Sequence, residues 1–240
     1  MKRVLQSLLS NFGYRIVRDR GSFDFDFLSP EDMKQPGVIL DVGAHLGTTT
    51  EVFLQQFPNM SVHCFEPYPQ FSSHLRTAFQ KQKQVSVHEY ALSDTDGQGA
   101  LITNDLNLSL ISRSGECHAA DGSDAGLETI DVPLRRLDDF VSDENIDNIF
   151  LLKIDTEGND LNVLKGGEEL LKRGGVDIIV CEYFFESIFE GGARYWEISQ
   201  YLELFGYGMF DIRDIKRRGD QKLRYGNAIF IGPRILKKIS

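Results

Sequence analysis

Apolar and polar positions follow two alternating periods along most of the chain, and these periods predict strands and helices in turn. Short apolar runs at 38–42, 61–66 and 85–91 are separated by segments of helical period at 48–57 and 69–81. Strands that alternate with helices are typical of right-handed crossovers, which place parallel strands in one sheet with helices on its faces. This part of the chain therefore predicts a doubly wound α/β fold.

The rhythm is interrupted over residues 94–134 and then resumes. Turn-forming residues and short strand-like pieces within 94–134 predict an inserted, exposed hairpin region. The elements predicted after it are a helix at 137–141, a strand at 149–154, a helix at 160–172, a strand at 176–182, a helix at 195–205, and closing strands at 208–212 and 227–231.

The first 36 residues predict an N-terminal appendage to one catalytic domain at 37–240, since 240 residues suit one well-filled domain. Residues 2–18 have helical period, and polar residues interrupt the apolar stretch that a signal peptide would need. Phe23, Phe25 and Phe27 alternate with aspartates, which predicts a short strand that covers the core or a cap over the substrate. Both interpretations remain open at this stage.

Composition excludes some classes of protein. Apolar residues make up 41% of the chain, the mean hydropathy is −0.25, and no run approaches the roughly 18 apolar residues of a membrane span. A net charge of −10 opposes a general affinity for nucleic acid, because phosphate contacts need clustered Lys and Arg. Cys64, Cys117 and Cys181 lack metal-ligand spacing, so we expect reduced thiols in a cytoplasmic protein that is not inserted in a membrane.

A glycine-rich turn joins the first apolar run to the helix that follows it. Gly43 and Gly47 allow a tight turn and close approach of a ligand, and Glu66 ends the next apolar run about 20 residues later, where a ribose-binding carboxylate is expected. The middle glycine of a dinucleotide fingerprint is missing, which disfavours an NAD-dependent dehydrogenase. Asp41 at the end of the strand suits a ligand with an amino group. The alternative is that the glycines only close a turn.

With these motifs the chain resembles class I S-adenosylmethionine-dependent methyltransferases, and the FkbM family in particular, over residues 38–231. The resemblance implies a Rossmann-like class I methyltransferase fold, with a seven-stranded, mostly parallel sheet and helices on both faces. It also implies transfer of a methyl group from S-adenosylmethionine to a hydroxyl of a sugar, glycan or polyketide-like secondary metabolite. The segments that carry it are 40–47, 65–67, 91–94, 132–140 and 152–166, the last being the most specific.

The resemblance assigns the parts of the cofactor to particular residues. Asp41 would lie near the methionine ammonium, the backbone of 43–47 would line the methionine, and Glu66 would accept both ribose hydroxyls, which suits a carboxylate. Ala91 and Leu92, expected at the end of the third strand, would contact adenine. The complete predicted cofactor site is Asp41, Gly43, Ala44, His45, Gly47, Thr48, Glu66, Pro67, Ala91, Leu92 and Asp155.

Asp155, Glu157 and His45 are the candidate catalytic residues. Methyl transfer from a sulfonium is an in-line displacement, so the protein mainly aligns the acceptor oxygen and removes its proton, which a carboxylate can do. The family more commonly has Asn at the position of His45, and this histidine is either a base or simply solvated. Asp155 could instead order its turn or contact the cofactor, and Glu157 could cap the next helix.

Asp155 and Glu182 end neighbouring predicted strands and form a candidate pair of metal ligands. A third oxygen ligand is not evident in the sequence, so Mg²⁺ is a less favoured alternative to a site without metal. The predicted partner is a small molecule or glycan with an acceptor hydroxyl, whose identity the sequence does not give, and a homo-oligomer is compatible with the sequence. The competing hypothesis is an inactive methyltransferase-like domain that only binds a nucleoside.

Overall fold

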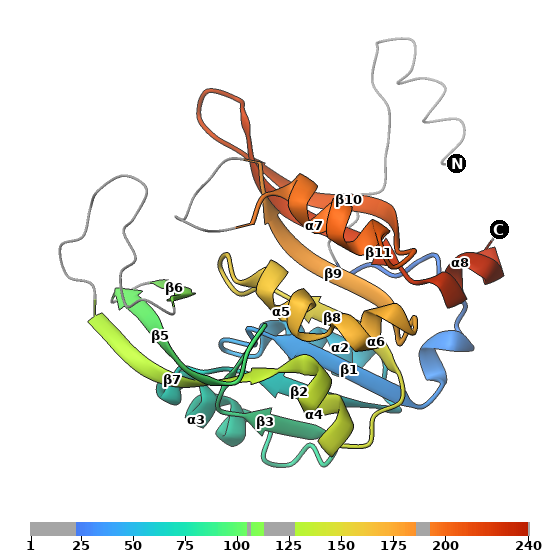
Figure 1. The fold of residues 1–240 in the computed structure, drawn as a ribbon. Helices are drawn as coiled ribbons and strands as arrows, with labels where there is room; N and C mark the ends of the chain where they lie inside the picture. The colour runs from blue at the N-terminus through green and yellow to red at the C-terminus, as the bar shows by residue number, and fades with distance from the viewer. Residues whose placement is uncertain (1–22, 105–106, 113–127, 186–192, 240) are drawn as a thin grey trace, which may run out of the picture.

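The protein is described from a computed structural model, which covers residues 23–104, 107–112, 128–185 and 193–239 (Figure 1). Seven strands form the main sheet in the order β10-β11-β9-β8-β1-β2-β3. Neighbours from β9 to β3 are parallel, whereas β11 runs antiparallel to both β9 and β10. The strands are β1 (Gly37–Val42), β2 (Met60–Phe65), β3 (Val85–His88), β8 (Ile149–Ile154), β9 (Val176–Phe184), β10 (Gly208–Arg217) and β11 (Leu223–Ile231).

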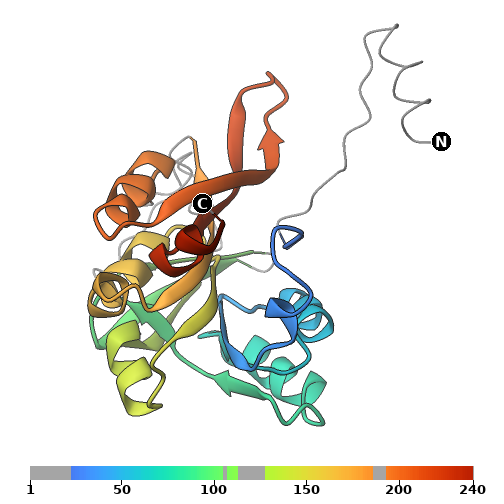
Figure 2. The same ribbon diagram turned by 90° about the vertical axis from the view of Figure 1, so that its right-hand side faces the viewer.

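Helices cover both faces of this sheet, which confirms the predicted α/β architecture (Figure 2). Leu40 and Val42 of β1 belong to one core cluster, and Ile39 belongs to the other, as the two-residue period of a strand requires. One face is covered by α2 (Thr48–Gln56) and α3 (Pro69–Ala78), and the other by α4 (Leu137–Asp143), α5 (Asp160–Gly166), α6 (Glu168–Lys172) and α7 (Tyr195–Glu203).

The predicted strand at 85–91 is in fact two strands in different sheets. β3 ends at His88, and β4 (Ala91–Ser93) pairs in parallel with β7 (Glu128–Arg136). These two strands join β5 (Gly97–Asn104) and β6 (Asn107–Ser112) in a second sheet of order β4-β7-β5-β6. The region predicted as an exposed hairpin does contain an antiparallel hairpin, β5–β6, but this hairpin belongs to a sheet with its own buried cluster, formed by Ala91, Leu101, Val132 and Leu134.

The predicted helix at 160–172 is divided into α5 and α6 at Gly166 and Gly167. A Cβ atom at Gly166 would lie 2.0 Å from the carbonyl oxygen of Ser93, so only glycine lets α5 approach β4 this closely. The end of the described chain forms another helix, α8 (Pro233–Ile239), which the sequence did not predict.

Residues 23–36 pack on the α2 side of the sheet, largely as turns and a short 3₁₀ helix, η1 (Asp32–Lys34). Phe25 is 2% exposed and its ring centroid lies 5.5 Å from that of Phe57. The predicted aromatic contact with the core is thus present, but the predicted strand is not. The helix predicted at 2–18 and Cys117 lie outside the described residues, whereas Cys64 and Cys181 are buried free thiols. None of the described helices has the length and apolar character needed to cross a membrane.

Candidate active site at the carboxyl edge of the sheet

The crevice between β1 and β8 is where the strand order of the main sheet reverses. Chain segments that leave these two strands diverge to opposite faces, and ligands of open α/β sheets bind in the opening that results. The glycine turn follows β1, and residues 155–158 follow β8. The two segments touch, because the amide of Asp155 donates to the carbonyl oxygen of Val42 at 3.1 Å. The structure therefore brings the two most informative motifs of the sequence to one edge.

The glycine turn has a backbone that only glycine adopts readily. Gly43 and Gly47 have φ angles of 74° and 86°, and a Cβ atom at Gly43 would lie 2.0 Å from the carbonyl oxygen of Asp155. The amides of Gly43 and Ala44 both donate to the carbonyl oxygen of Phe65, at 3.0 and 3.1 Å. These two N–H groups are therefore already used within the protein. A ligand can still approach the backbone of the turn closely, because the glycines have no side chains.

Glu66 follows β2 and is held in one orientation beside the turn. Its Oε2 accepts the His45 amide at 2.8 Å, and its Oε1 accepts the Tyr68 amide at 2.9 Å. Burial, with the residue only 3% exposed, raises the pKa of Glu66, although the two amide donors oppose this shift. Each oxygen keeps a further lone pair, so the carboxylate fits a pair of hydroxyl donors such as those of a ribose. Pro67 beside it is half-buried.

Asp41 is fully buried near the end of β1. It is 0% exposed, its Oδ2 accepts the Thr50 hydroxyl at 2.6 Å, and its Oδ1 lies 3.1 Å from the ammonium nitrogen of Lys153. Asp41 and Lys153 are opposite one another in the β1–β8 register. The predicted contact of Asp41 with the methionine ammonium therefore stays a prediction, and in the structure the carboxylate is paired with the ammonium of Lys153.

Lys153 is the site residue that sequence reasoning missed. Its ammonium also donates to the Gly43 carbonyl oxygen at 2.7 Å and lies 3.6 Å from Oδ2 of Asp155. Burial acts to lower the pKa of Lys153, but the charges of Asp41 and Asp155 outweigh it and raise this pKa. The signal in the sequence was a lysine within an otherwise apolar strand. Its structural effect is to tie the strand end, the glycine turn and Asp155 together.

Carboxylates gather where β8 and β9 end. Asp155, Glu157 and Glu182 each offer an oxygen, and these oxygens all lie within 4.8 Å of one another. Burial, followed by the charges of Asp155 and other carboxylates, raises the pKa of Glu157 to about 7 and that of Glu182 to about 9. The structure thus brings Asp155 and Glu182 close together, and it places the Glu157 carboxylate beside them, which the sequence did not reveal.

His45 and Thr48 lie at the solvent side of the turn. His45 has a φ angle of 50°, and its ring packs edge-on against Phe71 with centroids 4.2 Å apart. Burial lowers the pKa of His45, and the charge of Asp155 opposes this effect. An imidazole in this position favours the neutral form, which can accept a proton. Thr48 is the first residue of α2 and is exposed.

Ala91 and Leu92 are not at the end of the third strand. They belong to β4, where they are 4% and 1% exposed, and the carbonyl oxygen of Leu92 accepts the side-chain amide of Asn159 at 3.0 Å. The contact of these two residues with adenine therefore stays a prediction, and in the structure β4 pairs with β7 and packs against α5. Asn159, at 2% exposure, instead connects β4 to the loop that carries Asp155.

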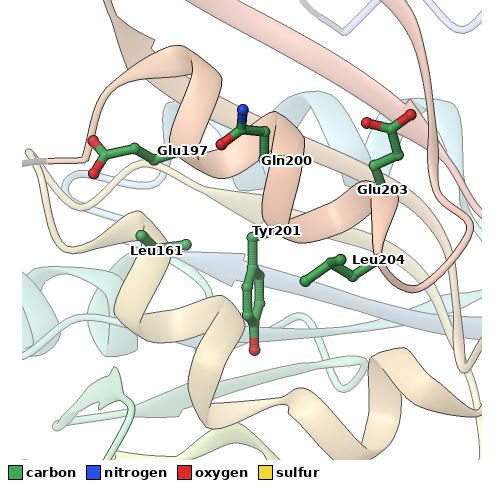
Figure 3. Close-up of a pocket in the computed structure, with 6 residues that line it drawn as sticks. All are labelled: Leu161, Glu197, Gln200, Tyr201, Glu203 and Leu204. Carbon is green, nitrogen blue, oxygen red and sulfur yellow. The ribbon is translucent and has the colours of Figure 1, made fainter.

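A groove of about 610 Å³ lies between α5 and α7 (Figure 3). Leu161, which directly follows Asp160 at the start of α5, forms one wall. The other wall comes from α7, where Tyr201 points towards α6 and lies 3.5 Å from Glu168. Both polar and apolar side chains line the groove, namely those of Leu161, Glu197, Gln200, Tyr201, Glu203 and Leu204.

Comparison with known proteins identifies the family to which these site residues belong. The sequence model of the family described as "Methyltransferase FkbM domain" matches residues 41–209. The 2-O-methyltransferase NoeI of Sinorhizobium fredii is 30% identical over 166 residues, which are 66% of this chain and 68% of that protein. The 31-O-demethyl-FK506 methyltransferase FkbM of Streptomyces tacrolimicus is 29% identical over 160 residues, 56% of this chain and 61% of that one.

Solved structures include a precorrin-6y C5,15-methyltransferase from Geobacter metallireducens, which is 12% identical, covers 85% of this chain and 82% of its own, and has a TM-score of 0.44. The family match extends over the glycine turn, Glu66 and the 155–158 segment, which are also the parts that the structure brings to one edge. The chain belongs to the FkbM methyltransferase family and is an S-adenosylmethionine-dependent methyltransferase.

Proposed function

We propose that the protein methylates a hydroxyl group of a sugar, glycan or polyketide-like secondary metabolite. The observation that carries this proposal is the group of carboxylates that Asp155, Glu157 and Glu182 form beside the glycine turn. S-adenosylmethionine supplies an electrophilic methyl group, and the carboxylates are placed to align a hydroxyl and to take its proton. The acceptor oxygen then gains the methyl group as the sulfur–carbon bond breaks.

In this proposal the cofactor site consists of the turn residues Gly43, Ala44, His45 and Gly47, with Thr48, Glu66, Pro67 and the backbone of Asp155 around it. Glu66 accepts both ribose hydroxyls through the lone pairs that His45 and Tyr68 leave available. Lys153 fixes Asp41, Gly43 and Asp155 relative to one another, and so fixes the edge on which the cofactor rests.

Asp155 is the proposed base, with Glu157 as the next proton acceptor. The Asp155 side chain is 42% exposed and can reach an acceptor, while Lys153 lies 3.6 Å behind it. A group with a pKa near the working pH transfers protons most efficiently, and the pKa of Glu157 is raised to about 7. His45 is the alternative base from the opposite side of the crevice, because burial lowers its pKa.

The charge of this edge favours an uncharged acceptor. Phosphate or carboxylate groups would meet the acidic side chains of Asp155, Glu157 and Glu182, and the nearby Lys153 is already paired. A polyhydroxylated acceptor avoids this repulsion and can donate to the carboxylates. The names of the two relatives describe O-methyltransferases, one of them acting on a derivative of FK506, which supports oxygen as the acceptor atom.

We also propose that the catalytic domain begins at residue 37 and that residues 1–36 form a cap over the substrate.

The test measures formation of S-adenosylhomocysteine with a panel of neutral sugars, oligosaccharides and polyketide alcohols. We expect turnover with a member of this panel and a fall in kcat of about 10²- to 10⁴-fold in Asp155→Asn. The affinity of that variant for S-adenosylmethionine should change little. Glu169→Gln on α6 is the matched control, since that side chain is exposed and remote in the sequence from the cluster. Binding of S-adenosylmethionine without turnover of any hydroxyl acceptor would favour the inactive, nucleoside-binding alternative.

A further inference from the structure

Three carboxylates converge at the carboxyl edge with the spacing of ligands around one ion. Asp155 and Glu157 belong to the loop after β8, and Glu182 lies in the neighbouring strand β9, one residue past the pairing of Ile154 with Cys181. Their nearest oxygens all lie within 4.8 Å of one another. Oxygen ligands lie about 2.0–2.6 Å from Mg²⁺ or Ca²⁺, so two ligands on opposite sides of the ion are about 4–5 Å apart. The three oxygens therefore fit one coordination sphere.

Among the described residues, the ion pairs of Lys153 leave this cluster with an excess of negative charge. Lys153 approaches only one member, Asp155, at 3.6 Å, and its shorter contacts are with Asp41 at 3.1 Å and the Gly43 carbonyl oxygen at 2.7 Å. Like charges so close together are costly in a half-buried environment.

An independent feature lies directly behind the cluster. Asp160 is 2% exposed, and its Oδ1 accepts no hydrogen bond among the residues that the structure describes. Its Oδ2 accepts the hydroxyl of Thr156 at 2.8 Å, so this carboxylate is directed at the loop between Asp155 and Glu157. Its charge contributes to the raised pKa of Glu157 and Glu182. A buried carboxylate oxygen without a donor needs a positive charge or a water molecule nearby, since burial of such a group without a partner is unfavourable.

We propose that Asp155, Glu157 and Glu182 bind one divalent cation of the Mg²⁺ or Mn²⁺ type, with Asp160 behind them contributing negative charge. Three protein oxygens leave three positions of an octahedral site open for water or for neighbouring hydroxyls of the acceptor. If the protein methylates a hydroxyl as proposed above, a cation here would orient that hydroxyl and lower its pKa. Binding of the cation itself does not depend on that function.

The first experiment titrates MnCl₂ into the full chain after treatment with a chelator, with no cofactor or acceptor present. Calorimetry and the loss of the free Mn²⁺ paramagnetic resonance signal should both give one Mn²⁺ per chain, and MgCl₂ should compete. Glu157→Gln and Glu182→Gln should each weaken Mn²⁺ binding at least tenfold. Glu169→Gln should bind as the wild type does. An absence of Mn²⁺ binding up to millimolar concentration, or unchanged binding in both variants, would overturn the proposal.

Thermal unfolding shows whether a variant fails to bind Mn²⁺ because it lacks a ligating side chain or because it is not folded. Without metal, Glu182→Gln should unfold at the wild-type temperature or above it, because the neutral amide replaces a carboxyl group whose charged form is disfavoured by burial and by the neighbouring carboxylates. Addition of MnCl₂ should raise the unfolding temperature of the wild type and not that of the variant. An equal increase in both proteins would show that Mn²⁺ binds elsewhere and would overturn the assignment.

Activity assays separate this inference from the proposed function. Loss of methylation in EDTA, restored by MgCl₂, would support the role of the cation in turnover. Full methylation in EDTA would overturn that role while leaving the proposed function intact. If Mn²⁺ binds at the three carboxylates but no hydroxyl acceptor is turned over, the proposed function fails and the metal site stands.

Discussion

The ammonium of Lys153 lies 3.1 Å from Oδ1 of Asp41, and the two side chains are 3% and 0% exposed. They face one another across β1 and β8, the two strands between which the order of the sheet reverses. Because the same ammonium also contacts the Gly43 carbonyl oxygen and approaches Asp155, one buried cation joins both loops of the site. The arrangement of the two loops at the carboxyl edge therefore depends on a buried ion pair within the protein.

Lys153→Met should destabilise the protein by about 3–5 kcal/mol, because it leaves the charge of Asp41 buried without a partner. Denaturation by urea measures this loss directly. The double variant Asp41→Asn with Lys153→Met should regain part of it, since the amide oxygen of Asn can still accept the Thr50 hydroxyl. Lys172→Met removes an exposed lysine and is the control. A Lys153→Met protein as stable as the wild type would contradict a structural role of the pair.

The alternating periods predicted the main sheet well because each strand and helix carries its own local signal. They did not place the boundary between β3 and β4. The chain stays largely apolar from Val85 to Leu92, and the change of sheet depends on the pairing of Ala91 with Leu134, which is distant in the sequence. Such pairing is a tertiary property, and local periodicity does not reveal it.

Site residues could be predicted where their position at a strand end was sufficient. Glu66 and Asp155 come to the expected edge for this reason. The partner of Asp41 could not be predicted, because it depends on the register between β1 and β8. The place of Glu157 depends on its left-handed backbone, with a φ angle of 52°, which is uncommon for a residue other than glycine. The position of the Glu157 carboxylate within 4.8 Å of Glu182 depends on this local geometry and on the pairing of β8 with β9, neither of which is visible as a spacing in the sequence.

Gly43→Ala should weaken both stability and cofactor binding. The added Cβ atom would lie 2.0 Å from the carbonyl oxygen of Asp155, so the two loops must separate. The positive φ angle adds a conformational cost on the order of 1–3 kcal/mol. Gly97→Ala is the matched control, because Gly97 has a φ angle of 131° but no atom within 4 Å of an added Cβ. Equal affinity for S-adenosylmethionine in the two variants, measured by calorimetry, would show that the close approach at Gly43 is not needed.

Acid should destabilise the protein through His88. Burial, with the charges of His63, Arg135 and Arg76, lowers the pKa of His88 from 6.5 to about 4. Below pH 6.5 the unfolded chain binds a proton that the folded chain binds only near pH 4, so stability falls as pH falls through this window. His88→Phe retains a ring beside Phe65 and should show a smaller decrease in unfolding temperature between pH 7 and 4. His74→Gln, at an exposed site, should show the same decrease as the wild type.

Glu66→Gln should weaken binding of S-adenosylmethionine about 10- to 100-fold, because a hydrogen bond to a charged group contributes about 1.5–3 kcal/mol. An amide keeps one accepting oxygen but replaces the other with a donor, which would face either the His45 amide or the Tyr68 amide and lose that contact. The substitution should therefore also disturb the orientation of the side chain at the edge.

Calorimetric titration of S-adenosylmethionine and of adenosine separates the ribose contact from contacts to the methionine part. Both ligands should lose affinity by a similar factor, whereas Glu51→Gln, on the exposed side of α2, should change neither. If only the affinity for S-adenosylmethionine falls, Glu66 contacts the methionine part of the cofactor and not the ribose.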